Sequence, residues 1–361
     1  QLTAVSATKI AAMTATQTGA LTSTQIASLS TTQVRAFTNA NLSALDASQS
    51  AALTGAQIAS LSTGQINSLN ATDVADLTAT QVAAMATTQV KALTATVIGD
   101  MTETKVAAFT ATQIASLATG NVAGLAETQA AALTAGQVAA FTASQIKELS
   151  ETNLSALNAT QVAAITATQI KALTNTQVEA LTAADVAEFT AAQLASLTTS
   201  QMAALNATNM ASLNATQVAS FTATQVARLG TEAVKGLDAT QMGALTATQV
   251  KALTATQIGA LDATDVGEIT TAQIGALTKT QVSSLSQTSL AGLTATQVGT
   301  FSTTQVQAFS GAALSALDAA QTAAMTTTQI AALTNTQIGG LNATDIGELD
   351  RMARMLHDAE E

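Results

Sequence analysis

The chain has 361 residues and a formal net charge of −11, and it contains no Pro, Cys, Trp or Tyr. Phosphate backbones require a basic surface, so no nucleic-acid partner is expected. Without Cys, and with a single His, the common zinc ligand sets and disulfides are excluded, and no run approaches the ~18–20 consecutive apolar residues of a membrane span.

An eight-residue repeat runs through almost the whole chain. A large apolar residue recurs every eight residues from Val5 to Leu349, 44 times without insertion or deletion. The repeat, here called the octad, has the consensus L-T-A-T-Q-V-A-A at positions 1 to 8, as in residues 245–252. Such strict periodicity predicts a repeat architecture with a shared core.

Position 2 indicates the secondary structure. It holds Thr, Ser, Asn or Asp in 40 of 44 octads, the exceptions being Ala86, Ala118, Ala126 and Gly230. These four residue types all cap helix N-termini, whereas Asn and Asp are poor strand residues. Gln follows at position 5 and completes a capping box, while positions 1 and 6 form the apolar pair of a hydrophobic staple. Each octad therefore predicts one short helix.

Two alternatives fit the pattern less well. In one continuous helix an eight-residue step would rotate each Leu by about 80°, so no apolar stripe would form. In a β-solenoid, positions 1 and 6 would point to opposite faces of the strand. We therefore expect an all-α solenoid of very short helices. Three per coil, a triangular prism, leaves no central hole that Leu and Val could not fill; a β-solenoid is the alternative.

A longer repeat lies above the octad. Segments 41–76, 153–188, 233–268 and 313–348 align with one another, and a partial copy begins at residue 121. We call these segments superrepeats. Because every copy keeps the octad phase, residues 1–348 are expected to form a single continuous solenoid. The pattern breaks after Leu349, and residues 349–361 are predicted to form an amphipathic C-terminal capping helix.

The candidate functional residues are few. Asp replaces Gln at position 5 in each superrepeat, with an acid three residues later, which makes four weak candidate cation sites: Asp73 with Asp76, Asp185 with Glu188, Asp265 with Glu268, and Asp345 with Glu348. The simpler interpretation is that Asp favours a helix N-terminus and its partner is a solvated acid. Lys and Arg at position 7, including Lys235, are expected to be surface charges. No catalytic residues, cofactor or metal are expected, and the chain is not predicted to be an enzyme.

The octad resembles the L-T-x-x-Q-[IV]-x-A-L repeats of very large bacterial surface or secreted proteins, over residues 5–348. The resemblance implies an extracellular or cell-surface location and a role as spacer, stalk or filament segment. We expect a structural rod. The N-terminal end has no cap comparable with the C-terminal one, so end-to-end self-association or continuation of a longer array is expected there. The alternative is a binding module whose regular Thr-rich face takes ice, a glycan or a protein.

Overall fold

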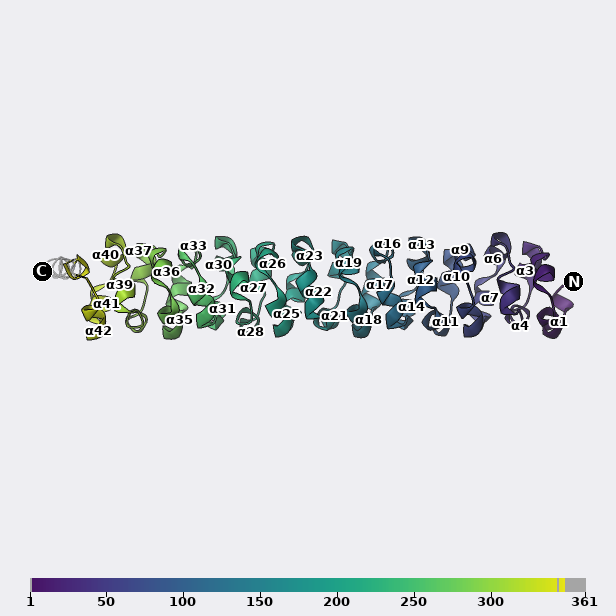
Figure 1. Ribbon diagram of the computed structural model, residues 1–361, viewed down its shortest axis with the longest axis horizontal. Coiled ribbons are helices and arrows are strands. Elements are labelled where there is room, and N and C mark those ends of the chain that lie inside the picture. The colour runs from purple at the N-terminus through teal and green to yellow at the C-terminus, as the bar shows by residue number, and fades with distance from the viewer. Residues whose placement is uncertain (1, 343, 348–361) are drawn as a thin grey trace. The chain divides into compact units, whose positions relative to one another are not determined.

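The computed structural model describes residues 2–342 and 344–347, and it divides the chain into two compact units, residues 1–177 and 178–361. In both units the secondary structure is a succession of helices of three to six residues, one per octad, winding around an axis (Figure 1). No strand occurs among the described residues. The predicted all-α solenoid of very short helices is confirmed, and the β-solenoid alternative is not supported.

The first unit contains η1 (Leu2–Ala4), α1 (Ala7–Ala11), α2 (Ala15–Gly19), α3 (Ser23–Ser28), α4 (Thr31–Arg35), α5 (Asn39–Leu42), α6 (Ala47–Ala52), α7 (Gly55–Ser60), α8 (Thr63–Asn67), α9 (Ala71–Asp76), α10 (Ala79–Ala84), α11 (Thr87–Ala92), α12 (Ala95–Gly99), α13 (Glu103–Val106), α14 (Ala111–Ser116), α15 (Thr119–Ala123), α16 (Glu127–Ala131), α17 (Ala135–Ala140), α18 (Ala143–Glu148), α19 (Glu151–Ser155), α20 (Ala159–Ala163) and α21 (Ala167–Ala172). Helix α22 (Asn175–Ala180) spans the boundary between the units.

The second unit contains α23 (Ala183–Ala187), α24 (Ala191–Ser196), α25 (Thr199–Ala204), α26 (Ala207–Ala211), α27 (Ala215–Ala219), α28 (Ala223–Val226), α29 (Thr231–Lys235), α30 (Ala239–Ala244), α31 (Ala247–Ala252), α32 (Ala255–Ala260), α33 (Ala263–Gly267), α34 (Thr271–Ala276), α35 (Lys279–Ser284), α36 (Gln287–Ala291), α37 (Ala295–Gly299), α38 (Thr303–Val306), α39 (Gly311–Leu314), α40 (Ala319–Ala323), α41 (Thr327–Ala331) and α42 (Asn335–Gly339). The predicted C-terminal capping helix, 349–361, lies outside the described residues.

The predicted capping box begins most of these helices. In α31 the backbone N–H of Gln249 donates to Thr246 Oγ1 over 3.3 Å, and Gln249 Oε1 accepts from the backbone N–H of Thr246 over 2.6 Å. At Ala86 only half of the box is present: Gln89 Oε1 accepts from the Ala86 N–H, and no side chain caps the N-terminus of α11. Position 2 therefore starts each helix, as the sequence predicts.

The core is built from positions 1 and 6. Leu245 is 4% exposed and Val250 is fully buried, and this pattern repeats along both units. Position 8 is small in most octads, and helices of neighbouring turns stack closely at some of these positions. A Cβ added to Gly292, at the C-terminus of α36, would lie 1.9 Å from the carbonyl oxygen of Ala263 in α33. Burial of the Leu and Val side chains supplies the main favourable term of folding.

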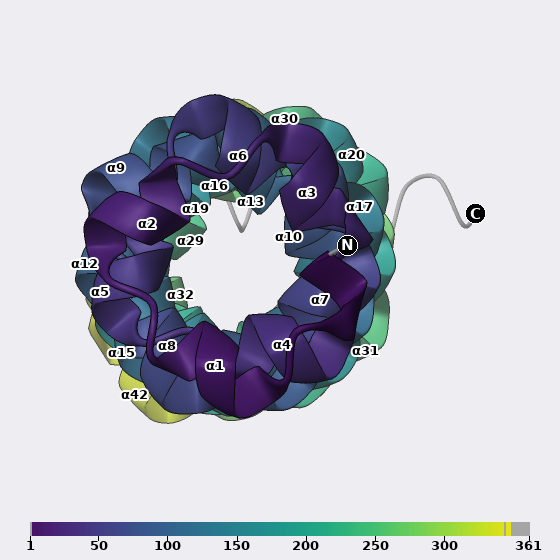
Figure 2. The same cartoon turned by 90° about the vertical axis from the view of Figure 1, so that its right-hand side faces the viewer.

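Each turn takes more than three octads and fewer than four. Within each unit most helices pack on the third helix along the chain, so that α1, α4 and α7 lie beside one another (Figure 2). The Gln at position 5, however, reaches further back: Gln57 Nε2 donates to the carbonyl oxygens of Leu29 and Ile26, over 2.7 and 3.0 Å. These residues lie 28 and 31 positions earlier. Three per coil thus describes helix-on-helix packing, but the turn itself is longer.

The extra length of the turn has a physical reason. The last carbonyls of a helix have no partner within that helix. Because successive turns are offset by 28 to 31 residues, the amide of a position-5 Gln lies next to such carbonyls. Gln305 Nε2, for example, donates to the carbonyl oxygens of Leu277 and Ile274, over 2.8 and 2.9 Å. Most position-5 Gln side chains are buried, and each serves its own N-cap with Oε1 and the preceding turn with Nε2. The triangular prism would leave these carbonyls unpaired.

Replacing one buried Gln should be costly. Gln145 is 1% exposed, accepts from the Thr142 N–H and donates to the carbonyls of Ile114 and Leu117. Gln145→Ala leaves these groups unpaired, so we expect a loss of about 2–4 kcal/mol of unfolding free energy in denaturant titration. Hydrogen exchange of the Thr142 amide should also accelerate. Ser144→Ala, on the same helix, is the matched control, and equal stability of the two variants would contradict the assignment.

Candidate functional site

The four Asp residues at position 5 occupy the place of the inter-turn Gln. Asp73 and Asp265 are each 8% exposed, whereas Asp185 and Asp345 are half-buried. Each carboxylate accepts from the backbone N–H of its own N-cap residue, over 2.8 to 3.0 Å. Asp therefore preserves the capping half of the Gln function. A carboxylate has no proton to donate, so the other half is lost.

Other residues at position 5 retain part of the inter-turn contact. Asn209 Nδ2 donates to the carbonyl of Leu181 over 2.9 Å, and Ser289 Oγ donates to that of Leu261 over 2.6 Å, each 28 residues earlier. Lys105 Nζ donates to the carbonyls of Val74 and Ala75, over 2.9 and 2.6 Å. Most residues at position 5 thus carry an N–H or O–H donor; the residues without one are the four Asp and, in the other exceptions, Val97, Ala233 and Ala313.

The preceding turn supplies a hydroxyl donor to the Asp carboxylate at two of these sites. Ser43 Oγ donates to Asp73 Oδ2 over 3.0 Å, and Ser315 Oγ donates to Asp345 Oδ2. Both serines lie at position 7, 30 residues before the Asp. At the same spacing before Asp265 stands Lys235, whose positive charge acts on the Asp265 carboxylate. Lys235 is half-buried, so it is not a simple surface charge.

These pairs explain the superrepeat. Each superrepeat begins at position 5 of one octad and ends at position 8 of the Asp octad, four octads later. The first, 41–76, contains both Ser43 and Asp73. In sequence, Ser155 precedes Asp185 by the same 30 residues. The first and last octads of a superrepeat therefore lie in successive turns and contact each other. The sequence alone predicts the superrepeat. It does not predict the contact between position 7 and the Asp 30 residues later, because that contact depends on the length of the turn.

The predicted acidic pairs differ in their surroundings. The pKa of Lys105 in the next turn is lowered, mainly by burial. The charge of Asp76, the half-buried last residue of α9, partly offsets this effect. Burial raises the pKa of Glu188, and the charge of Asp185 raises it further. Glu188 Oε2 is buried without a hydrogen-bond partner in the described part of the chain. Glu348 lies outside the described residues.

Asp265 and Glu268 form the most charged of these clusters. Burial raises the pKa of Asp265, and the charges of Asp262 and Glu232 act in the same direction. The backbone hydrogen bond from Asp262 and the charge of Lys235 oppose them. Burial also raises the pKa of Glu268, followed by the charges of Asp265, Asp238 and Asp262. Within residues 2–342 and 344–347 no three His, Cys, Asp or Glu residues gather as a metal site would require.

The Thr-rich pattern divides into two roles. The Thr at position 2 is used as a cap: Thr254 Oγ1, for example, accepts from the Gln257 N–H over 3.1 Å. The Thr at position 4, such as Thr248 and Thr256, is exposed. The Thr at position 2 is also exposed in octads such as those of Thr246 and Thr254, but its oxygen is engaged in the cap, as the capping argument predicts.

No protein-family model matches the chain, and a search among curated proteins finds no match. Among the described residues, no helix has the length and apolarity needed to cross a lipid bilayer.

Neutralising Asp265 should change the pH dependence of stability. Its pKa is raised in the folded state, so its contribution to stability is fully present below the ordinary carboxyl pKa and is lost as the pH rises through the raised value. Asp265→Asn preserves the cap and can donate to the Leu237 carbonyl, as Asn209 does to Leu181. We expect about 1 kcal/mol more unfolding free energy at pH 7, and a flatter profile above the ordinary carboxyl pKa of about 4.

Denaturant titrations at several pH values measure this difference. Asp100→Asn removes an exposed carboxylate and is the control. A parallel shift of the whole profile in both variants would mean that net charge, rather than the buried Asp265, is responsible.

Proposed function

We propose that the chain is a structural repeat protein: a rod that acts as a spacer, stalk or filament segment of a bacterial surface or secreted assembly, without catalytic activity. The observation that carries this proposal is the use of the polar side chains. The Thr, Gln and Asp side chains at positions 2 and 5 are spent on helix caps and contacts between turns. Catalysis requires unlike groups converging in one place, and the repeat distributes like groups evenly.

The surface or secreted location rests on the octad resemblance. The alternative function, a binding module, is favoured by one observation: exposed Thr residues recur at position 4. These residues lie on short helices, and contacts between turns join residues 28 to 31 positions apart, which is not a whole number of octads. Thr residues of successive turns are therefore offset from one another and do not form the flat ladder that an ice surface would match. A glycan or protein ligand would need less regularity.

A spacer predicts that length can be changed without other consequences. Deleting residues 233–312 removes ten octads, the interval between two superrepeat starts, and preserves the phase. We expect the maximum dimension in small-angle X-ray scattering to fall by about a fifth, with the helical circular-dichroism signal per residue unchanged. Deleting residues 233–308 breaks the phase and should melt helices near the junction.

A particle whose size does not follow the number of octads would contradict the spacer. Inhibition of ice growth, or saturable glycan binding that is lost when position-4 Thr residues are replaced by Ala, would favour the binding module.

The N-terminal end of this rod is proposed to contact either a second copy of the chain or the preceding turn of a longer array. In the first turn the side chains of Gln17 and Gln25 are exposed and serve only their own caps, with no acceptor for either amide in the described part of the chain. In later turns the same amide binds leucine carbonyls. End-to-end association would give both amides acceptors, and a contact between unlike ends generates filaments.

Light scattering tests this association. We expect the mean mass to rise with protein concentration, and Gln17→Glu/Gln25→Glu to reduce the rise several-fold, because Glu caps the helix but cannot donate at neutral pH. Monodisperse monomers at high concentration would contradict the proposal.

A further inference from the structure

Two small cavities occupy corresponding places in two superrepeats. One, of about 20 Å³, is bordered by Asp73, Ser50 and Leu45 in the first unit. The other, of about 10 Å³, is bordered by Asp345, Thr322 and Leu317 in the second unit. Each residue of the first set has the same octad position as its counterpart in the second. Their recurrence indicates a feature built into the superrepeat rather than an accident of packing.

The cavities arise where position 6 carries a small polar residue. Position 6 is usually Val or Ile, and the residues equivalent to Ser50 and Thr322 in the other two superrepeats are Val162 and Met242. Ser50 and Thr322 are each 7% exposed. Their shorter side chains leave space beside the core leucines that Val would fill.

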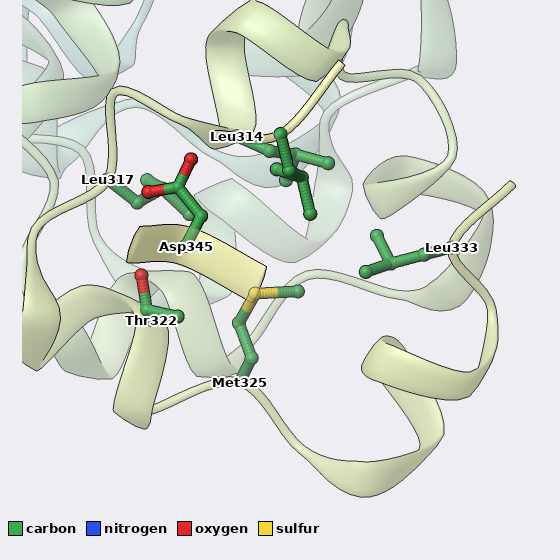
Figure 3. Close-up of a pocket in the computed structure, with 7 residues that line it drawn as sticks. Leu314, Leu317, Thr322, Met325, Leu333 and Asp345 are labelled. Atoms are coloured by element: carbon green, nitrogen blue, oxygen red, sulfur yellow. The ribbon is translucent and has the colours of Figure 1, made fainter. Parts of the chain in front are cut away.

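The hydroxyl groups of Ser50 and Thr322 have no hydrogen-bond partner in the described part of the chain. Thr18, a third polar residue at position 6, differs: its hydroxyl donates to the Thr14 carbonyl over 3.1 Å and accepts from Asn41 Nδ2. In Figure 3 the hydroxyl oxygen of Thr322 is turned toward the side on which Asp345 lies. A buried hydroxyl costs free energy unless it is hydrogen-bonded, so both sites call for a polar occupant.

The other polar groups of each site are acceptors. The Asp73 carboxylate accepts through Oδ2 from the Asn70 N–H and from Ser43 Oγ, and it has no proton to give. Leu45 lies 28 residues before Asp73, and its carbonyl oxygen has no donor among the described residues, whereas Gln81 serves the equivalent Leu53 over 2.7 Å. Leu317 stands in the same relation to Asp345. Within the described part of the chain, each space is thus bordered by an Asp, by a residue with an unpaired hydroxyl and by a leucine whose carbonyl has no donor, among side chains that are otherwise mostly apolar.

We propose that each cavity binds one ordered water molecule, which donates to the Asp carboxylate and to the leucine carbonyl and is hydrogen-bonded to the Ser50 or Thr322 hydroxyl. A cavity of roughly 10–15 Å³ or more accommodates one water, and a buried water typically has about three polar partners. The water takes over the donor role of the missing Gln amide, so the two Asp turns are joined through solvent.

A metal cation fits these cavities less well. Ca²⁺ takes about six to eight oxygen ligands, and Mg²⁺ requires about six in a near-ideal octahedron. Each cavity has one carboxylate, one side-chain hydroxyl and one free carbonyl, with leucine side chains around them and no room for ligand waters. The carboxylate is also already engaged with an N–H and a hydroxyl donor in both sites.

Magnetic relaxation dispersion of the water nuclei counts long-lived buried waters in the full chain. We expect Ser50→Val/Thr322→Val to release two of them, because Val is the residue found at the equivalent position 162. Thr72→Val, an exposed change on the helix of Asp73, should release none. Asp73→Gln/Asp345→Gln provides a second route, because the restored amide donates directly to the leucine carbonyl and displaces the same two waters.

High-resolution diffraction from the unmodified chain gives an independent reading, whether or not the variants fold. A water peak within hydrogen-bonding distance of Ser50 Oγ and the Asp73 carboxylate, and its equivalent at Thr322 and Asp345, is the expected result. Empty cavities, or unchanged water counts in both double variants, would overturn the proposal. So would a peak that gains anomalous signal when crystals are soaked in rubidium, because the occupant would then be a cation.

Discussion

The fold depends on one side chain, the Gln at position 5. A helix of four to six residues leaves most of its backbone N–H and C=O groups without partners, so an isolated octad would not be stable. The Gln amide addresses both ends at once, since Oε1 accepts from the helix's own N-cap and Nε2 donates to carbonyls of the preceding turn. This double contact sets the 28- to 31-residue offset between turns, and the Leu and Val core follows from it.

The polar residues that replace Gln at position 5 show how each half of that contact can change. Asn and Ser preserve the bond to the carbonyl 28 residues earlier, and Lys105 reaches carbonyls 30 and 31 residues earlier. Asp preserves only the cap, and Ser43 and Ser315 at position 7 of the preceding turn supply hydroxyl donors to it. Where Ser50 or Thr322 also replaces the usual Val, the missing donor becomes space for a small polar molecule.

Local structure could be predicted from the sequence because its causes lie within one octad. Cap, box and staple span six residues, such as residues 245–250, and the cap and box bonds are present at Thr246 and Gln249. The turn length could not be predicted, because a period of eight carries no information about an offset of 28. One signal was available: a capping box accepts Glu as well as Gln, yet position 5 never holds Glu. That exclusion indicates a second role for the amide nitrogen, as a donor, and hence a contact outside the octad.

The same coupling limits how such an array can lengthen. An octad with Gln at position 5 can be copied freely, because each copy brings both the acceptor and the donor. An Asp octad cannot, since its carboxylate needs Ser or Lys 30 residues earlier. A duplicated block must therefore include both members of the pair, and the superrepeats 41–76, 233–268 and 313–348 each do. Selection for length alone would not preserve that pairing, so the superrepeat records the contact between turns.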